Sequence, residues 1–338
     1  MTKLLLRDVS DGLNLLINNN GCYDLTVDFG GDKNLDRCYR FHDSFLLTHF
    51  HKDHYNGILN CQNHNFCWRL DNHHSCWHLD NFYHPVMPSF KEDKVFFLCL
   101  LAMNIRISKN HPIQSTILSL VRKLNRKPLH FIPVAKGDIF VCGNRKYEIL
   151  WPPRELKEED ILKVIKSAIK DFEKAKEADS TLKDIYRNVS LQYSESNINE
   201  VNERDVEIDF TEQETSEEVT EVIQKANTSL RKAANRLSVA FRQDDNILFL
   251  GDLEKKEINF VVDDLIKQNN TSYDILISSH HGTHWGNSLK SIHCDICLAS
   301  IGSTLRSHIA YDYKDISNKF VRTDEWGDIR ITRKHNIK

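Results

Sequence analysis

Short runs of hydrophobic residues, separated by polar turns, recur through the first half and the last third of the chain. Leu13–Ile17 and Leu25–Gly31 flank an asparagine-rich turn, a pattern that predicts two strands joined as a hairpin. Ser44–Thr48 predicts a further, buried strand. Strands interleaved with helical segments favour an α/β fold in layers. The remaining predictions are helices at 90–106, 112–126 and 255–268, and strands at 129–134, 138–142, 147–151, 237–241, 247–250, 275–277, 296–301 and 329–332.

The composition changes between residues 155 and 225. Residues 158–177 predict a charged amphipathic helix, and the residues after it are polar and acidic. From 195 to 221, eleven acidic residues stand against a single Arg204, a composition typical of a solvated arm without a packed core. We therefore predict a charged helical and acidic insertion at 155–225, between an N-terminal half of the fold at 1–154 and a C-terminal half at 226–338.

Overall composition is that of an ordinary globular protein. The 338 residues are 40% hydrophobic, and a net charge of −3 provides no overall basic field for nucleic acid, although a local basic groove is compatible with it. The longest hydrophobic run, Val95–Met103, is far shorter than the roughly 20 residues of a membrane helix, so we expect no membrane span. Nine scattered cysteines and an N-terminus without a signal-like segment predict a reduced, cytoplasmic protein.

The densest chemical signal is the cluster His49, His51, Asp53 and His54, directly after a predicted strand. Imidazoles two residues apart on an extended segment can point to the same side, and the Asp and His after them can turn towards a second cation. One short loop can therefore supply two metal ions. The alternatives are a chance cluster in a chain with 17 histidines, or a structural zinc knot, which would usually use cysteines.

Two later strands also end in candidate ligands. Ile247–Leu250 is followed by a glycine and Asp252, and a carboxylate at a strand end can bridge two cations, although such a dipeptide alone is more often an ordinary turn. The run at 275–277 leads into the pair His280 and His281. The same layout thus occurs three times, and this repetition supports Asp252 as a candidate ligand.

With these clusters, the chain resembles the metallo-β-lactamase superfamily over most of its length outside the insertion. Its nearest resemblance there is to the hydrolase domain of ComEC-like competence proteins, without their membrane channel. This implies a four-layer αββα sandwich and a freestanding metal-dependent hydrolase. Besides the histidine cluster, the resemblance is carried by Asp8–Asn14, Val27–Gly30, Ile149–Pro153, His280–Thr283 and Arg322–Ile329.

The resemblance also implies roles for the ligands. The remaining ligand of the second metal would be His280 or His281; we favour His280, which leaves the strand first, and the other would bind substrate or orient a ligand. Asp28 would support the histidine loop without touching metal. The other implied ligands are His49 and His51 for the first ion, Asp53 and His54 for the second, and Asp252 between them.

One departure from the superfamily pattern concerns the first metal. A third histidine is expected one strand pair ahead of the bridging aspartate, and Asn235 stands there instead. A neutral amide oxygen is a weaker ligand for zinc and a better one for manganese or magnesium. Two divalent ions, zinc or manganese, remain the predicted cofactors, with the first site weakly filled or filled only with substrate.

The implied chemistry is hydrolysis by a water whose pKa is lowered towards neutrality by the paired cations. Asp53 could also orient that water as a base. His308 is either an acid or phosphate ligand, as the resemblance implies, or an ordinary surface histidine.

Three functions fit these residues. The first is a phosphodiesterase or nuclease acting on DNA or another phosphodiester, because the resemblance implies phosphoester chemistry. The second is hydrolysis of carboxyl esters, thioesters or lactones at the same centre. The third is a partner-binding component of a defence or regulatory system, with a vestigial metal centre and a protein partner bound through the acidic insertion.

Other conspicuous residues have plainer interpretations. Cys294 and Cys297 begin a hydrophobic run, so strand packing is favoured over a redox or zinc motif. Irregular spacing likewise favours a structural loop over a second metal site for His73, His74, His78 and His84.

Overall fold

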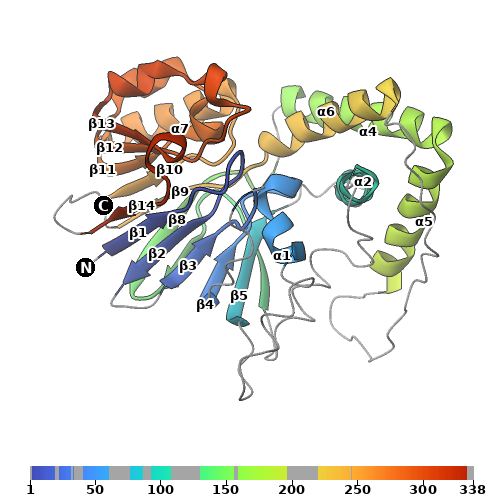
Figure 1. The fold of residues 1–338 in the computed structure, drawn as a ribbon, viewed down its shortest axis with the longest axis horizontal. Coiled ribbons are helices and arrows are strands. Elements are labelled where there is room, and N and C mark those ends of the chain that lie inside the picture. Colours follow the sequence, from blue (N-terminus) through green and yellow to red (C-terminus); the bar gives the residue numbers. More distant parts are fainter. Residues whose placement is uncertain are drawn as a thin grey trace. The chain divides into compact units, whose positions relative to one another are not determined.

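Figure 1 shows the computed structural model of the chain, in which residues 2–19, 23–31, 33, 41–60, 77–86, 93–107, 130–155, 159–195, 220–244 and 246–332 are described. The chain divides into two compact units. The first comprises Met1–Val86, Val121–Arg154 and Asn235–Lys338, and the second comprises Met87–Leu120 and Glu155–Ala234.

Two mixed sheets of seven strands each build the first unit. The first sheet and the turns beside it contain β1 (Thr2–Leu6), β2 (Leu15–Asn19), β3 (Tyr23–Val27), β4 (Phe41–Leu46), η1 (Lys52–His54), α1 (Asn56–Asn60), β5 (Trp77–Pro85), β6 (His130–Val134) and β14 (Ile329–Ile331). The strand order is β14-β1-β2-β3-β4-β5-β6. The strands from β14 to β3 are antiparallel neighbours, and those from β3 to β6 run parallel.

The second sheet combines two strands from before the predicted insertion with five from after it. Its elements are β7 (Ile139–Cys142), β8 (Arg145–Trp151), β9 (Ala240–Gln243), β10 (Ile247–Phe249), α7 (Lys255–Lys267), β11 (Ser272–Ile277), η3 (Ser279–Gly282), η4 (Asn287–Ser291), β12 (His293–Ala299), η5 (Arg306–His308), η6 (Tyr311–Lys314), β13 (Ser317–Arg322) and α8 (Thr323–Trp326). The strand order is β13-β12-β11-β10-β9-β8-β7, parallel from β10 to β13 and antiparallel from β7 to β10. Helix α7 lies on the face turned away from the first sheet (Figure 1).

The core lies between the facing sides of the two sheets. Every second residue of a strand points inwards, as Leu15 and Ile17 do from β2. Three aromatic rings stack in this layer, with centroids 4.1 Å apart for Tyr83 and Phe140 and 4.9 Å apart for Phe140 and Tyr147. Burial of each large side chain contributes about 1.5–3 kcal/mol, so this layer holds the strand ends, and the loops on them, in place.

The second unit is helical and contains α2 (Asp93–Arg106), α4 (Glu159–Ala178), α5 (Ser180–Glu195) and all but the last residue of α6 (Glu221–Asn235). Helix α4 buries one stripe, including Ile161, Ile165 and Phe172, at helical spacing. Arg106 donates two hydrogen bonds, of 3.0 and 2.8 Å, to the carboxylate of Asp179 between α4 and α5. The unit thus has its own buried stripe and its own internal ion pair.

The structure confirms the predicted α/β architecture with two layered sheets. The hairpin of β2 and β3, helix α2, the strand run β6 to β8, and helices α4 and α7 are confirmed. The predicted helix at 112–126 and most of the acidic stretch at 195–221 lie outside the described residues.

Four elements differ from the prediction. Residues 77–85 form strand β5 and not a loop, and β13 was not predicted. Helices α5 and α6 occupy Ser180–Glu195 and Glu221–Asn235, which we expected to be a polar linker and its end. Both helices bury apolar residues at helical spacing, such as Leu182 and Ile185 in α5, and this burial outweighs their polar composition.

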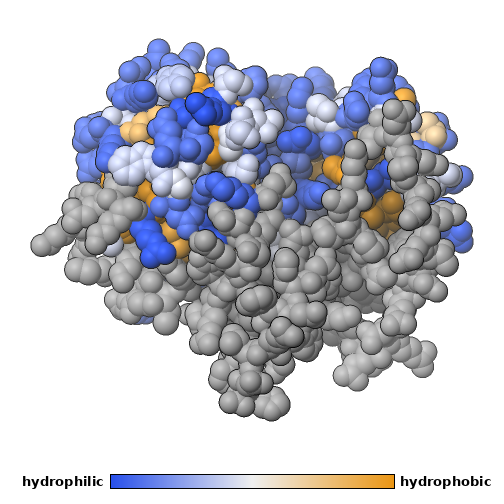
Figure 2. All heavy atoms as spheres, viewed as in Figure 1, coloured by the Kyte–Doolittle hydropathy of each residue, from blue (hydrophilic) through white to orange (hydrophobic). Residues whose placement is uncertain are grey.

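The visible surface of the described residues is mainly hydrophilic, with hydrophobic atoms confined to small areas (Figure 2). None of the helices within the described ranges is both long and apolar enough to span a membrane.

Candidate metal centre

The first histidine loop comes after β4 and is held by a buried carboxylate. Asp28, just after β3, accepts hydrogen bonds from the Thr48 amide (2.7 Å) and the Thr48 hydroxyl (2.6 Å). Nδ1 of His54 lies 2.6 Å from the same carboxylate. Gly30 permits this close packing, because a Cβ there would lie 1.9 Å from the Asp53 carbonyl oxygen. Asp28 therefore fixes both ends of the loop.

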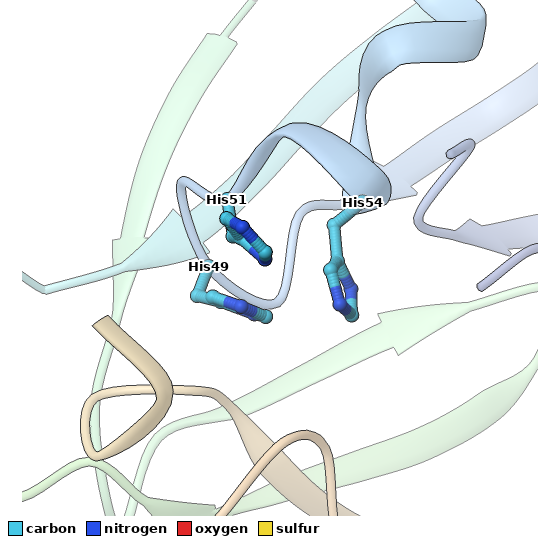
Figure 3. A group of neighbouring side chains, drawn as sticks. All are labelled: His49, His51 and His54. Atoms are coloured by element: carbon cyan, nitrogen blue, oxygen red, sulfur yellow. The ribbon is translucent and has the colours of Figure 1, made fainter. Parts of the chain in front are cut away.

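Three histidines of this loop converge. The side chains of His49, His51 and His54 are buried and point towards a common space (Figure 3). One ring nitrogen from each lies within 4.8 Å of the others. The ring of His51 also contacts the Asp53 carboxylate through Nδ1. The loop thus presents several donor atoms to one small volume.

A second group joins this loop to later segments. Asp53, His54 and His281 each bring one ligand atom within 4.8 Å of the others. Oδ2 of Asp252, in the turn after β10, lies 3.2 Å from Nε2 of His54 and 3.6 Å from Nε2 of His281. Two ligands of one tetrahedral ion, each about 2.1 Å from it, lie roughly 3.4 Å apart. These spacings therefore suit a shared cation.

The histidine pair comes after β11 in a left-handed turn. The φ angles of His280, His281 and Gly282 are 45°, 59° and 86°. Such angles cost roughly 1–2 kcal/mol for a residue with a Cβ. Here they are held by hydrogen bonds from the His280 amide to the Gly251 carbonyl and from the Ala310 amide to the Gly282 carbonyl, both 2.9 Å. Strain at this point marks a turn that the surrounding structure enforces.

The hydrogen bonds decide which ring nitrogens are free to bind a metal. Nδ1 of His54 faces the Asp28 carboxylate, and Nδ1 of His281 lies 2.9 Å from the Ser300 carbonyl oxygen, so each Nδ1 is a donor. The Thr48 hydroxyl donates to Asp28 and so accepts from Nδ1 of His49, 3.1 Å away. In the neutral rings, the lone pair is then on Nε2.

These free nitrogens pass a direct test of fit. Nε2 of His49 and Nε2 of His281 are buried and have no hydrogen-bond partner among the residues that the structure describes. A buried nitrogen with an unused lone pair is costly unless a ligand occupies it. Histidines whose outer nitrogen is tied to a carbonyl or carboxylate are typical of metal sites. The donor set therefore fits divalent metal ions.

The carboxylates of the centre are ionised. Burial raises the pKa of Asp252, but His54 and His281 beside it bring that pKa well below its usual value. Burial opposes ionisation of Asp53 as well, and His51 and His54 again bring the pKa below its usual value. The centre thus presents negative charge to a cation at neutral pH.

The histidines divide into two kinds. Burial lowers the pKa of His49 well below its usual value and that of His280 to about 3, so both rings are neutral. Burial also opposes a charge on His54, but Asp252 and Asp28 raise its pKa well above the usual value. In the metal-free protein His54 therefore holds a proton that an arriving cation would displace.

Three further predicted residues are placed differently from one another. Asn235 is buried at the end of α6, with Nδ2 3.3 Å from Nε2 of His280. His280 reaches Asp252, at 3.7 Å, but lies outside the two compact ligand groups, whereas His281 lies in one of them. His308 is exposed in η5.

Several supporting residues were not singled out from the sequence. Thr48 anchors His49 through its hydroxyl, and Ser300 anchors His281 through its main-chain carbonyl. Neither role leaves a signal in the sequence. His284 has a sequence signal, its spacing of four residues from His280, and its Nε2 lies 2.8 Å from Nδ1 of His280.

Cys294 and Cys297 are buried in β12. His78 and His84 lie on β5, and His73 and His74 are outside the described residues.

Comparisons with known proteins give a full-length but low-scoring structural match. No protein-family model and no curated protein matches the chain. A search of solved structures finds the metallo-β-lactamase fold protein YhfI from Bacillus subtilis, with 11% identity and a TM-score of 0.40. The match covers 95% of this chain and 96% of that one.

Proposed function

We propose that this protein is a hydrolase that uses two divalent metal ions. The observation that carries the proposal is the convergence of His54 and His281 on the Asp252 carboxylate, with the Nε2 atoms of His49 and His281 left without hydrogen-bond partners among the described residues. The proposed ligands are His49 and His51 for the first ion, Asp53, His54 and His281 for the second, and Asp252 between them.

His281, and not His280, is the proposed nitrogen ligand of the second ion. Its Nδ1 is tied to the Ser300 carbonyl, and its Nε2 belongs to the compact group with Asp53 and His54. The sequence-based preference for His280 rested on the order of residues after the strand. That order does not determine which ring faces the second group, because the backbone is left-handed at both histidines.

The chain's own residues would prepare the reaction. Paired cations, when bound, would lower the pKa of a water and stabilise negative charge on the attacked centre. Asp53, with its lowered pKa, is ionised and can accept a hydrogen bond from that water and so orient it. Asp28 holds His54 by Nδ1 and keeps Nε2 directed at the centre.

We further propose a phosphodiester as the substrate, with DNA as the first candidate. In-line displacement at phosphorus suits two cations that bind both the attacking and the leaving oxygen. One segment that carries the resemblance to ComEC-like proteins, Asp8–Asn14, contacts the residues that support His281. Ser300, which accepts from His281, donates to the Gly12 carbonyl (2.7 Å), and Asp11 accepts from the Gly302 amide (2.8 Å).

The first experiment combines metal content with cleavage on one preparation. Wild type, Asp252→Ala and the control Asp263→Ala, an exposed carboxylate on α7, are loaded with zinc or manganese. We expect about two ions per wild-type and control chain, cleavage of bis-p-nitrophenyl phosphate or DNA, and loss of both in Asp252→Ala. Absence of stoichiometric metal from the wild type would reject the hydrolase. Two ions with turnover of esters or lactones but of no phosphodiester would reject the substrate class.

A further inference from the structure

Strand β7 is an edge of the second sheet that lacks the charged residues and prolines by which edge strands usually avoid pairing with other strands. Of the other edge strands in the described sheets, β14 carries the exposed Arg330, β6 carries Pro133 and β13 carries the exposed Lys319. Strand β7, Ile139–Cys142, contains neither a charged residue nor a proline. Among these edges it is therefore the least protected against a further strand.

The outer face of β7 exposes two β-branched hydrophobic side chains. Ile139 is 62% exposed and Val141 is 59% exposed, the largest fractions among the large hydrophobic residues that the structure describes. Phe140 and Cys142, which alternate with them, belong to the core. A further strand beside β7 would cover this exposed apolar surface, and removing such surface from water is favourable.

The hydrogen bonds of the β7–β8 hairpin leave the main-chain groups of Ile139 and Val141 at the edge. The two-residue turn at 143–144, with φ angles of 56° and 67°, makes Cys142 part of a hydrogen-bonded pair. Such pairs alternate along an antiparallel ladder, and the carbonyl of Asp138, four residues earlier, accepts a hydrogen bond of 2.9 Å from β8. The amides and carbonyls of Ile139 and Val141 therefore point away from β8.

A second copy of the same strand fits this edge in an antiparallel register. If Phe140 of each copy lies on a two-fold axis, Ile139 of either copy is opposite Val141 of the other. Each of these pairs can then exchange both of its N–H···O bonds. A register centred on Ile139 or on Val141 would pair only one of the exposed side chains with its equal. Beyond the strand ends, Gly143 comes opposite Gly137, and neither has a side chain that obstructs the approach.

The charges on β8 are complementary in the register centred on Phe140. Within the hairpin, Lys146 lies opposite Val141 and Glu148 lies opposite Ile139. Each row across two hairpins therefore runs from Lys146 of one copy, through a pair of apolar side chains, to Glu148 of the other. Opposite charges thus flank both apolar pairs, and neither row ends in two like charges.

We propose that two copies of this chain associate through β7, in an antiparallel pair centred on Phe140, so that their second sheets continue into each other. The contact involves four residues of each strand, and interfaces smaller than about 1,200 Å² are typically transient. We therefore expect a reversible dimer with a dissociation constant on the order of 10–100 µM. The metal centre takes no part in this contact, so the dimer and the hydrolase can be tested independently.

The test is sedimentation velocity of the full chain over a concentration series that extends well above the expected dissociation constant. Ile139→Lys and Val141→Glu each place a charge in both apolar rows. The matched control is Val222→Lys, which adds a charge to an exposed hydrophobic position (41%) on helix α6, away from the sheet edges. Circular dichroism and thermal unfolding report whether each variant folds.

We expect a concentration-dependent dimer for the wild type and for Val222→Lys. Each single charge on β7 should weaken the dimer by about 10-fold or more, because it lies opposite an apolar side chain in both rows. The double variant Ile139→Lys/Val141→Glu should recover most of the loss, because it sets a lysine opposite a glutamate in each row. A register centred on either residue would instead set like charges against each other.

The proposal is overturned if the wild type stays monomeric throughout the series, a result that would favour a strand of a different protein at this edge. It is also overturned if the folded single variants dimerise like the wild type, or if Val222→Lys weakens the dimer as much as they do. Failure of the double variant to recover the dimer would reject the register centred on Phe140.

Discussion

Two loops bring histidines to the centre, and they hold them in different ways. The loop at 49–54 is tied to a buried side chain, Asp28, which contacts both Thr48 and His54. The loop at 280–284 is tied to main-chain carbonyls, those of Leu253 and Ser300. A side-chain anchor can be removed by one substitution and carries charge. A carbonyl anchor is present whatever the sequence, but it depends on the backbone path.

The largest effect is expected from breaking the packing of the first loop. Gly30→Ala would place a Cβ 1.9 Å from the Asp53 carbonyl oxygen, a main-chain atom that cannot move without the loop. We expect a loss of about 3 kcal/mol or more in the free energy of unfolding, together with loss of metal binding. Urea denaturation and zinc titration measure both. Unchanged stability would show that the loop is looser than described.

The second-largest effect is expected from removing the charge of Asp28, which anchors the first loop. Asp28→Asn keeps the shape of the side chain but presents an amide group to His54 and Thr48. Nδ1 of His54 then loses its acceptor, so the lone pair of the ring is no longer fixed on Nε2. Zinc affinity should fall by about 10–100-fold. A side-chain change at Ser300 should not lower the zinc affinity in this way, because the anchor there is the main-chain carbonyl. Equal losses in Asp28→Asn and Ser300→Ala would contradict the comparison.

The backbone of the second loop can be tested at Gly282. Its φ of 86° suits glycine, and a Cβ there would lie 3.0 Å from the side chain of Ala299. Gly282→Ala should cost roughly 1–2 kcal/mol, less than Gly30→Ala, because the nearest neighbour is a side chain. Chemical denaturation of the two variants in parallel gives the ranking. The reverse order would show that the second loop is the more tightly constrained.

Two histidines, one from each loop, should respond to pH with opposite signs in the metal-free protein. The pKa of His54 is raised, so its contribution to stability is complete below about pH 6.5 and is lost as the pH rises through the raised value. The pKa of His280 is lowered to about 3, so stability falls as the pH decreases below about 6.5. Thermal unfolding of chelator-treated protein tests both, and the acid-side loss should be smaller in His280→Asn than in the wild type, with His49 and the carboxylates of the centre contributing the rest. An unchanged acid-side profile in that variant would contradict the assignment.

The smallest effect is expected at His308. It is exposed in η5, next to the residues whose main chain supports Gly282. His308→Ala should change the free energy of unfolding by less than about 0.5 kcal/mol. Cleavage of phosphodiesters at several pH values shows whether the residue also acts as an acid. A tenfold loss with loss of the alkaline limb would restore that role.

The two loops also show how far the sequence could predict the site. Ligand types and spacing are local, so the cluster at 49–54 and the strand ends before Asp252 and His281 could be recognised directly. The sequence-based preference for His280 over His281 rested on chain order, and our proposal of His281 rests on φ angles and contacts that residue types do not reveal at a non-glycine position. Distant partners such as the Ser300 carbonyl are equally invisible, because every residue carries one.

The same distinction holds for the fold. Strands β6 to β8 were predictable from continuous hydrophobic runs. Strand β5 mixes histidine, asparagine and aromatic residues, and β13 is polar along its exposed part, so neither shows the expected alternation. Helix α6 buries Ile223, Ala226, Leu230 and Ala233 at helical spacing, a stripe that is present in the sequence and was overlooked at the end of the expected linker.

The interleaving of strands has a practical consequence for dividing the protein. A cut between α5 and α6 would give one fragment with β1 to β8 and another with β9 to β14. Neither fragment contains a complete sheet, since β8 pairs with β9 and β1 pairs with β14. His49 and His54 would lie on one fragment, and Asp252 and His281 on the other. Metal binding would then report reassembly of the two halves, as in a split reporter.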